Sequence, residues 1–460
     1  MLLAAAFLTL GLGAGAVRTL QLDWYANHKA LNTTIGTVDW VKYGFKRGLM
    51  NIKLQFSLDD RVGLPQVRLY ISEKSQRALM DNPPDSTKKW RRAFMKYPDG
   101  SIEKIKVRYR GDNPLNWLFM KKSIRIKTSK KRLLERRRVL NINVPQSDNM
   151  MEVYLGFSIA HDAGLLTPRA RLVEMFVNDE PYGVLVEYDQ PGEVFVRNSG
   201  QMPVNLYKGE QAHIERSESI ELDLFDNPDL WDKVAVGNDL PVEDFSDLSY
   251  FLDLIRRAFN DDESYRTLQR VAPFSVWARY AAFQTLTQNA HNTGYHNQRL
   301  LADPWRGEVR PILNDPILLW NPGLGLVDRR FNVAAYRDAP ADELEIDTQS
   351  LIRVYNSDPA FTLAKYRFLY GFLTKDKLLE RTRRRIAETT EPLIISAQRD
   401  GDMWREQLWP GFPFTGPGEK LRRHLQQYSA DIAKVERWLI ERLEATPEAR
   451  WRNSNGRLAL

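Results

Sequence analysis

Lys104-Ile-Lys-Val-Arg-Tyr109 and Ser123-Ile-Arg-Ile-Lys127 are two short stretches in which apolar and polar side chains alternate. A period of two is typical of a β-strand with one buried face. The stretches Asn51–Phe56 and Gln66–Ile71 show the same alternation, and the turn sequence Tyr97-Pro-Asp-Gly100 lies where a hairpin needs one. This region is therefore predicted to form an antiparallel sheet.

A helix and two further strands extend the β-rich unit. Residues 152–163 have apolar side chains at helical spacing and are followed by Gly164, a favourable helix C-cap. Two strand-like runs follow at 170–177 and 182–188, joined by the turn-prone linker Asn178-Asp-Glu-Pro181. We place this unit at about residues 40–200.

Beyond residue 200 the chain is predicted to be mostly helical. Stretches with a helical apolar period occur at 248–260, 274–288, 362–373, 376–399 and 421–443. The strand-like run Val309–Leu313 interrupts them. The basic run Arg381–Arg385 is most simply a solvated helix face, with a surface for an anionic partner as the alternative. The predicted fold class is α+β, with a helical unit at 201–335 and a helical extension at 336–460.

The amino terminus is apolar. Residues Met1–Val17 carry no charged side chain, and as a helix they would span about 25 Å, just short of a hydrocarbon core. Ala14-Gly15-Ala16 resembles a small-residue cleavage site. Residues 1–20 are predicted to be a membrane anchor or a signal segment, with a buried core helix as the alternative. Export would place the remaining chain in the cell envelope.

Composition limits the chemistry that the chain can support. With 460 residues, 43% of them hydrophobic, it can bury a substantial core in more than one unit. The absence of cysteine excludes disulfides, cysteine-ligated zinc, iron–sulfur clusters and a thiol nucleophile. A net charge of +7 is a mild excess that suits anionic ligands such as phosphates and does not indicate a nucleic-acid partner.

Two polar segments of the helical unit could carry chemistry. The loop 288–297 contains His291, His296 and three asparagines, and such a loop is costly to order unless its polar groups have partners. Zinc binding by these histidines is disfavoured by their i,i+5 spacing. Asp315 follows the strand-like run, and a carboxylate at a strand end beside an amide-rich loop suits Mg²⁺ and its phosphate ligands.

Basic residues in the β-rich unit allow two interpretations. Arg108–Asn113 forms a glycine-containing turn after a strand, and Lys121–Lys127 follows it. Basic strand residues beside such a turn can hold phosphate oxygens, although a solvated sheet face with a tight hairpin is the simpler explanation of the segment alone. The same choice applies to Lys208, which precedes Gly209.

The order of these motifs resembles the CotH kinase family, atypical kinases first associated with bacterial spore coats. That family has an Arg-Gly-Asn/Asp turn, then Lys-Lys-Ser-aromatic/aliphatic-Lys, and later Asn-Gly-x-x-Tyr-Gly. The resemblance covers about residues 100 to 320, and its matching segments are Arg110–Asn113, Lys121–Lys127, Leu140–Val144 with Asp148, Ala163–Leu166, Asn178–Glu187, Asn205–Lys208, Tyr295–Asn297, Leu300–Pro304 and Pro311–Pro316.

The resemblance implies a two-lobed, kinase-like fold in which the β-rich unit is the N-lobe and the helical unit is the C-lobe. It implies that Glu187 and Tyr188 lie at the hinge that meets the adenine of ATP. Lys122, Lys127 and Lys208 are then the candidate cations for the phosphates.

The catalytic loop of the family is an Asp followed five residues later by an Asn, and it corresponds here to residues 292–297. Asn292 stands where the Asp is expected and cannot accept a proton as a carboxylate does. The role of base would then fall to His291 or His296. Asp315 corresponds to the Mg²⁺-binding Asp, with Asn297 as a second metal ligand.

Three hypotheses follow. The first is an ATP- and Mg²⁺-dependent kinase that phosphorylates a protein or glycan hydroxyl of the cell envelope and contacts the membrane through its N-terminal segment. The second is a catalytically silent, pseudokinase-like scaffold in envelope or polysaccharide assembly, which Asn292 favours. The third is a polysaccharide-binding structural protein that uses some of the 12 Trp and 18 Tyr residues.

Overall fold

The computed structural model describes residues 62–82, 85–111, 121–145, 150–201, 203–210, 223–235, 241–287, 289, 292, 294, 297–317, 319, 350–400, 418–444, 452–454 and 457–459. The predicted anchor or signal segment at residues 1–20 lies outside this part of the chain. None of the helices described within these ranges has both the length and the apolar character needed to cross a bilayer.

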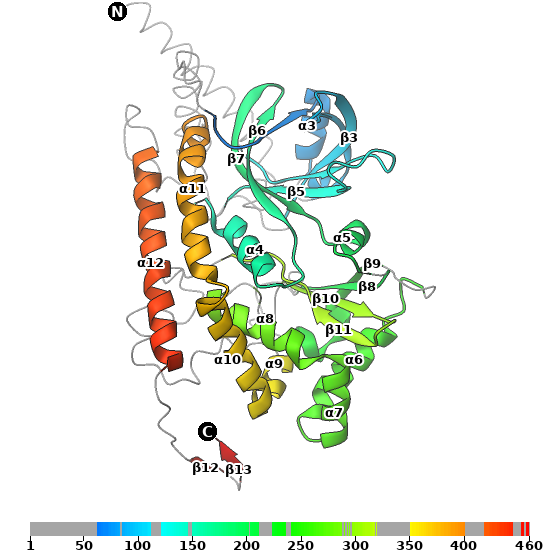
Figure 1. Cartoon of the computed structure of the whole chain (residues 1–460). Helices are drawn as coiled ribbons and strands as arrows, with labels where there is room; N and C mark the ends of the chain where they lie inside the picture. Colours follow the sequence, from blue (N-terminus) through cyan, green and yellow to red (C-terminus); the bar gives the residue numbers. More distant parts are fainter. Residues whose placement is uncertain are drawn as a thin grey trace, which may run out of the picture.

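The β-rich part is a closed barrel with the strand order β1-β2-β3-β4-β5-β7-β6 (Figure 1). Its neighbouring strands pair antiparallel, except that β1 pairs parallel with β6 and thereby closes the barrel. The strands are β1 (Gln66–Tyr70), β2 (Arg91–Lys96), β3 (Ile102–Tyr109), β4 (Ile124–Lys127), β5 (Val139–Asn143), β6 (Ala170–Val177) and β7 (Glu180–Asp189). A β-rich N-terminal region was predicted and is confirmed.

The apolar half of each alternating strand fills the barrel. Val107 of β3 and Ile126 of β4 are 1% and 0% exposed, and they share one core with Leu79 of α3 (Glu73–Met80). Burying a side chain of this kind stabilises the fold by about 1.5–3 kcal/mol. Because side chains alternate along a strand, the basic half of β3 and β4 lies on the outer face.

A second core joins the barrel to the helical part. Phe157 of α4 (Glu152–Asp162) contacts Tyr188 of β7, with ring centroids 5.1 Å apart. Both residues belong to the same buried cluster as Leu300 and Leu313 of the helical part. The two lobes are therefore connected by continuous packing and not only by the chain.

The helical part contains a four-stranded sheet with the order β11-β10-β8-β9. Of its four strands, only the β11 region was predicted. β10 was missed because every one of its residues is buried and its sequence does not alternate. The strands are β8 (Asn205–Gly209), β9 (Trp231–Ala235), β10 (Gln298–Asp303) and β11 (Glu308–Pro311). The nearby helices are α5 (Glu193–Asn198), α6 (Ser246–Ala258), α7 (Asp262–Val271) and α8 (Phe274–Thr287), with short 3₁₀ turns η3 (Leu224–Asp226) and η4 (Pro228–Leu230); η1 (Ser86–Lys88) precedes β2.

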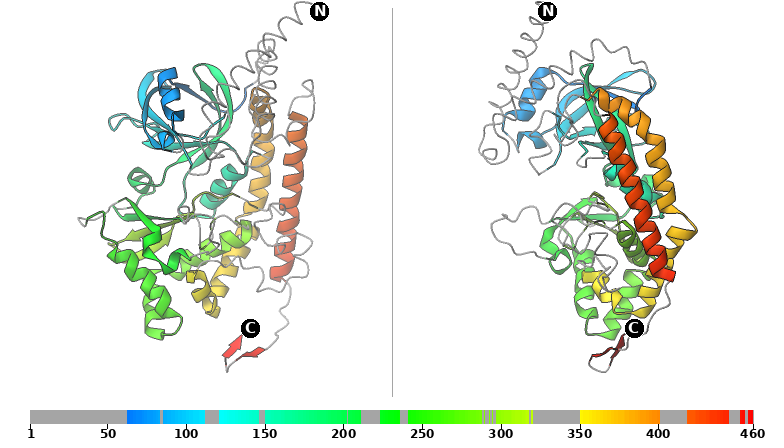
Figure 2. Two further views of the ribbon diagram at one scale, coloured as in Figure 1. Left: turned by 180° about the vertical axis from the view of Figure 1, so that it is seen from behind. Right: turned by 90° about the vertical axis from the view of Figure 1, so that its left-hand side faces the viewer.

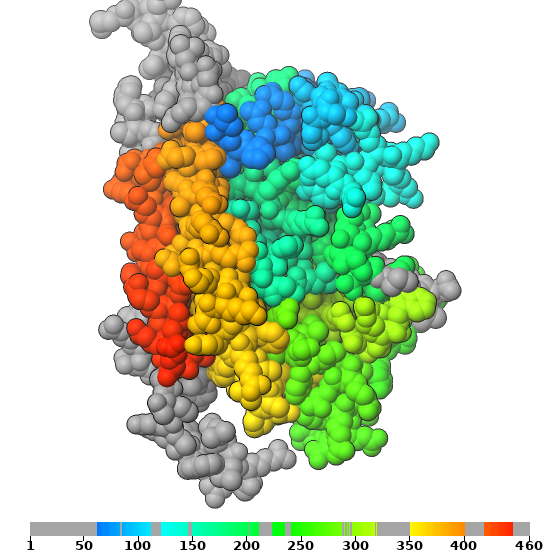
Figure 3. Space-filling model, viewed as in Figure 1, coloured from blue at the N-terminus to red at the C-terminus, as the bar shows by residue number. Residues whose placement is uncertain are grey.

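The C-terminal helices brace both lobes. The long helices α11 and α12 lie side by side along one flank of the molecule, from the barrel to α10 (Figures 2 and 3). Their bounds are α9 (Ser350–Asn356), α10 (Pro359–Thr374), α11 (Leu378–Gln398) and α12 (Gly418–Glu444), followed by the hairpin β12 (Arg452–Ser454) and β13 (Arg457–Ala459).

The basic run on α11 has specific partners. Arg381 and Arg385 form ion pairs with Asp162 at the end of α4, at 3.0 and 2.5 Å. Arg383 pairs with Glu436 of α12 at 2.7 Å. The prediction of a merely solvated helix face was therefore wrong, because these arginines tie α11 to α4 and α12.

Candidate functional site

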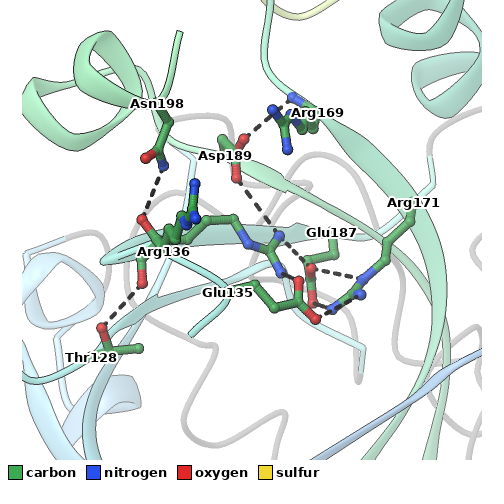
Figure 4. A network of polar contacts seen from close by, with 9 residues as sticks. Thr128, Glu135, Arg136, Arg169, Arg171, Glu187, Asp189 and Asn198 are labelled. Atoms are coloured by element: carbon green, nitrogen blue, oxygen red, sulfur yellow. Dashed lines mark hydrogen bonds and ion pairs between the residues drawn. The ribbon is translucent and has the colours of Figure 1, made fainter. Parts of the chain in front are cut away.

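The predicted hinge residues point to opposite faces of β7. The carboxylate of Glu187 is fully buried and forms ion pairs with Arg137 at 2.6 Å and with Arg171 at 2.9 Å. Figure 4 shows Glu187 in this polar network, beside Glu135 and Asp189. Since two guanidinium groups already bind it, the carboxylate of Glu187 is not available to a nucleotide.

A cavity of about 430 Å³ adjoins this network. It is lined by polar groups of the loops around the barrel end, among them Arg136, Arg169, Asp189 and Asn198. Asp315 does not line it. The cavity is therefore separate from the residues that the family resemblance singles out for metal and phosphate.

Tyr188 lies on the outer face of the barrel. Its hydroxyl accepts a hydrogen bond from Asn143 Nδ2 at 2.9 Å, and the guanidinium of Arg110 lies 5.2 Å from its ring centroid. The residues Arg108, Arg125, Asn141 and Tyr188 are successive cross-strand partners, so they form one row on this face.

Within this row, Arg125 is held in place by an amide. Its Nε donates to Asn141 Oδ1 at 2.7 Å. Asn141 is fully buried and also donates to Gln190 Oε1, at 3.0 Å, at the end of the strand that joins the lobes. The position of the Arg125 side chain is thus tied to the hinge segment.

The turn that carries Asp315 packs directly on α4. A Cβ atom placed on Gly156 would lie 2.6 Å from the side chain of Pro316, so only glycine allows the turn to approach the helix this closely. Asp315 itself has a φ of 52°, in the left-handed region. The backbone N–H of Ile317 donates to the carbonyl of Asp315 at 3.0 Å. The packing of this turn against α4 therefore fixes the backbone position of Asp315.

Asn292 connects the predicted catalytic loop to this turn. Its Nδ2 donates to the carbonyl oxygens of Asn297 at 3.2 Å and of Asn314 at 2.5 Å. Its Oδ1 accepts from Asn289 Nδ2. The side chain is 4% exposed. Asn292 therefore has a structural role, because its amide holds the backbone of the predicted catalytic loop next to the Asp315 turn.

Electrostatic interactions link three arginines, Tyr188 and Asp315. Burial lowers the pKa of Arg125 to about 9, and the charges of Arg110 and Arg108 lower it further. Burial also lowers the pKa of Arg299 to about 10, while Glu210 and Asp315 oppose this shift. Burial raises the pKa of Tyr188 to about 12, with Arg110 acting to lower it and Asp315 to raise it. We call Arg110, Arg125, Arg299 and Asp315 the arginine–aspartate site.

The three arginines of this site differ in burial, since Arg299 is 9% exposed whereas Arg110 and Arg125 are half-buried. Within the described ranges, no carboxylate forms an ion pair with Arg110, Arg125 or Arg299. Nε of Arg110 is buried and has no hydrogen-bond partner there. Partly buried cations without an ion-pair partner are suited to bind an anion, and guanidinium groups match the geometry of phosphate oxygens.

The site can also contribute to metal binding. The described residues contain no cluster of three or more His, Asp or Glu side chains that could hold a metal ion. A Mg²⁺ ion held by Asp315 would take its other ligands from the Asn297 amide oxygen, phosphate and water, as this ion commonly does. The residues present fit a metal that arrives together with phosphate.

The predicted cations lie in different surroundings. Lys122 is buried at the start of β4 with its ammonium 5.8 Å from the Tyr109 ring. Lys127 lies on the outer face, 5.6 Å from a ring of Trp90. Lys208 is on β8, opposite Arg299 of β10. Of the other predicted site residues, Asn297 has a φ of 57°, and His291 and His296 lie outside the described residues.

Sequence reasoning did not single out Arg110, Arg125 and Arg299 as candidate site residues. A signal existed for two of them. Arg125 occupies the last position of the Lys-Lys-Ser-aliphatic-Lys motif, and Arg110 opens the Arg-Gly-Asp turn. Arg299 had no signal, because the strand β10 on which it lies was not predicted.

Residues 107–321 match the family model described as CotH kinase protein. The match confirms the resemblance over this segment, which is kinase-like and contains Arg110, Arg125, Arg299 and Asp315. No curated protein matches the chain.

Solved structures show only weak likeness. The chain is similar to the proinflammatory kinase CtkA of Helicobacter pylori, with 13% identity, 69% of this chain and 94% of that chain covered, and a TM-score of 0.24. It is also similar to a chain in the complex of HipA, HipB and operator DNA from the toxin–antitoxin system of Shewanella oneidensis MR-1, with 13% identity, 67% and 61% covered, and a TM-score of 0.25. TM-scores this low do not establish a common fold.

Proposed function

We propose, starting from the CotH kinase match over residues 107–321, that the arginine–aspartate site binds the phosphates of ATP together with Mg²⁺. The observation that carries this proposal is that Arg110, Arg125 and Arg299 form no ion pair with a carboxylate of the described residues, while the charges of Arg110 and Asp315 both act on Arg299. Phosphoryl transfer depends mainly on positioning and on cations that stabilise developing charge, and this site supplies both.

Each residue of the site then has a role. Asp315 binds Mg²⁺, and the amide oxygen of Asn297 is its second protein ligand. Arg110, Arg125 and Arg299 bind phosphate oxygens and neutralise their charge. The adenine contacts the backbone that follows β7, because the Glu187 carboxylate is already paired.

The wider proposal concerns substrate and location. The protein transfers phosphate from ATP to a protein or glycan hydroxyl in the cell envelope, residues 1–20 serve as a membrane anchor or signal segment, and nucleic acid is not a partner. The apolar sequence of Met1–Val17 supports export. The N-lobe, C-lobe and helical extension are proposed at 40–200, 201–335 and 336–460.

A second candidate function is a catalytically silent, nucleotide-binding scaffold. The bonding of Asn292 favours it, since its amide donates to two carbonyl oxygens and presents no proton acceptor to a substrate hydroxyl. Such a protein would bind Mg²⁺–ATP without transferring phosphate.

Calorimetric titration of the full chain with Mg²⁺–ATP tests the binding site. Binding that is lost in Asp315→Ala and kept in Asp229→Ala, an exposed aspartate of η4, supports the proposal. Absence of binding to the folded wild-type chain overturns it. Incubation with radiolabelled ATP and a cell-envelope extract then separates the two functions, because only the kinase labels an acceptor.

A further inference from the structure

The outer face of β2, β3 and β4 carries cations that lie directly opposite one another. Arg92 of β2 is the cross-strand partner of Lys106 of β3, which is in turn the partner of Lys127 of β4. In the next row, Arg108 is the partner of Arg125. Like charges at directly opposite positions destabilise a sheet, so this arrangement costs stability unless an anion offsets it.

These three strands place no carboxylate on the same face. Glu103 is the one acidic residue in β2, β3 and β4; it occupies the alternate position and is paired with Arg132 at 2.7 Å. Partial burial lowers the pKa of Lys127, and the charges of Arg138 and Lys106 lower it further. We call the outward residues Arg92, Lys96, Lys104, Lys106, Arg108, Arg125 and Lys127 the basic sheet face.

Apolar groups lie among these cations. Trp90 is flanked by Arg108, 5.1 Å from a ring, and by Lys127, 5.6 Å from a ring. Phe94 of β2 and Ile102 of β3 are 47% and 58% exposed on the same face. A partner made only of phosphates or sugar acids would leave these two side chains in water, whereas an acidic polypeptide can cover them with apolar residues of its own.

The face continues into the arginine–aspartate site. Arg125 belongs to both, and its row leads by cross-strand pairing through Asn141 to Tyr188. We propose that the basic sheet face is the docking surface for an acidic polypeptide segment that contains apolar residues. The identity of this partner rests on the proposed function. The segment belongs to the phosphate acceptor and guides the acceptor hydroxyl toward the arginine–aspartate site.

Fluorescence anisotropy with a labelled peptide of alternating Glu and Phe residues tests the surface on the full chain. The double variant Arg92→Glu/Lys106→Glu is expected to weaken binding by about tenfold or more, because two attractions become repulsions. The matched control, Arg266→Glu/Lys375→Glu, makes the same charge change at exposed positions on α7 and after α10, and is expected to bind like the wild type. Equal weakening by both variants overturns the proposal.

The apolar part of the proposal has its own variant. Phe94→Ser is expected to weaken binding of the Glu–Phe peptide several-fold and to leave binding of an all-Glu peptide unchanged. Two further probes are used separately: vesicles of phosphatidylglycerol, and heparin. If the double variant loses vesicle or heparin binding and still binds the Glu–Phe peptide like the wild type, the occupant is a membrane or a polyanionic glycan and the proposal is overturned.

The peptide experiment does not depend on ATP, so the two proposals fail separately. Neither Arg92 nor Lys106 belongs to the arginine–aspartate site, and Mg²⁺–ATP titration of the double variant is expected to match that of the wild type. Peptide binding without any ATP binding would overturn the proposed function and leave the docking surface in place.

Discussion

Lys121 and Asp400 form a fully buried ion pair, with Nζ 2.5 Å from Oδ2 and exposed fractions of 1% and 0%. The backbone N–H of Val184 donates to the same carboxylate oxygen at 2.9 Å, and Lys121 donates to the carbonyl of Val184 at 3.1 Å. Lys121 precedes β4 in the barrel, and Asp400 follows α11. The pair therefore connects the end of α11 to the barrel.

Removal of the Asp400 carboxylate should strongly destabilise the protein. Asp400→Ala leaves the ammonium of Lys121 buried without a counter-charge, which costs about 3–5 kcal/mol in comparable pairs. Urea unfolding measures the loss. The control Glu193→Ala removes an exposed pair with Arg197 and should cost less than about 1 kcal/mol. Equal costs for the two variants would refute the role assigned to the buried pair.

Gly183 lies where the Asp400 carboxylate leaves no room for a side chain. It has a φ of 106°, and an added Cβ would lie 2.3 Å from the Asp400 carboxylate. Gly183→Ala should therefore cost about 1–3 kcal/mol more than Gly100→Ala, because Gly100 has a similar φ of 84° and open space around it. Urea unfolding of both variants isolates the contact from the backbone strain that they share. A cost for Gly183→Ala no larger than that for Gly100→Ala would contradict this account.

Local sequence patterns predicted β1, β3, β4, β6 and β7 of the barrel, but neither β2 and β5 nor the closure of the barrel. The strand predicted at Asn51–Phe56 lies outside the described residues. Alternation in β3 and β4 was sufficient because one face of each strand is buried, whereas the β1–β6 pair joins segments about a hundred residues apart and leaves no local signal. The adjacent residues Lys121 and Lys122 show the same limit. Their sequence context is nearly identical, yet only Lys121 meets Asp400, and that choice depends on a long-range contact.

The candidate site was predictable in its acidic part and not in its cations. Asp315 follows the strand-like run Val309–Leu313, so a carboxylate after a strand was visible in the sequence, although β11 already ends at Pro311. Which basic residues approach it depends on strand register and on the packing of two lobes. Arg125 and Lys127 occupy equivalent positions in the alternation, and cross-strand pairing alone sets Arg125 beside Asn141 and Tyr188.

Arg125→Ala should weaken Mg²⁺–ATP binding by about 10–100-fold, because charge-assisted hydrogen bonds contribute about 1.5–3 kcal/mol. Arg125→Lys should recover part of the affinity, since it keeps the charge and loses the two-pronged geometry. Calorimetry of both variants beside Arg266→Ala, an exposed arginine of α7, provides the comparison. Wild-type affinity in Arg125→Ala would exclude this residue from phosphate binding.

Asp189 should make stability depend on pH in a characteristic direction. Burial raises the pKa of this carboxyl in the folded state. Its contribution to stability is therefore fully present below the pKa of the unfolded chain, about 3.9, and is lost as pH rises through the higher folded-state pKa. Asp189→Asn should gain stability relative to the wild type as pH increases from about 4 to 7, as measured by urea unfolding at each pH.

Asp99 provides a control of opposite sign. Hydrogen bonds from Ser101 lower the pKa of Asp99 in the folded state. The stability that it contributes is present above the unfolded-state pKa and is lost as pH falls through the folded-state value. Asp99→Asn should therefore lose stability relative to the wild type as pH rises. Parallel pH profiles for the two variants would refute the assignment for Asp189.

Asn292→Asp is the substitution that restores the residue found in the family motif, and we expect it to harm this protein. The new carboxylate would face the carbonyl oxygens of Asn297 and Asn314, to which the amide now donates. Unsatisfied acceptors of this kind cost about 1–3 kcal/mol. The loss should be smaller at acidic pH, where a protonated carboxyl can donate one hydrogen bond.

Urea unfolding at two pH values measures this cost, and Asn198→Asp is the matched control because its amide makes one exposed hydrogen bond to the Arg136 carbonyl. We also expect no gain in phosphate transfer from Asn292→Asp, since the side chain is directed at the backbone that links the loop to the Asp315 turn. A clear gain in labelling of an acceptor with unchanged stability would show that position 292 faces a substrate, and would contradict the structural role of Asn292.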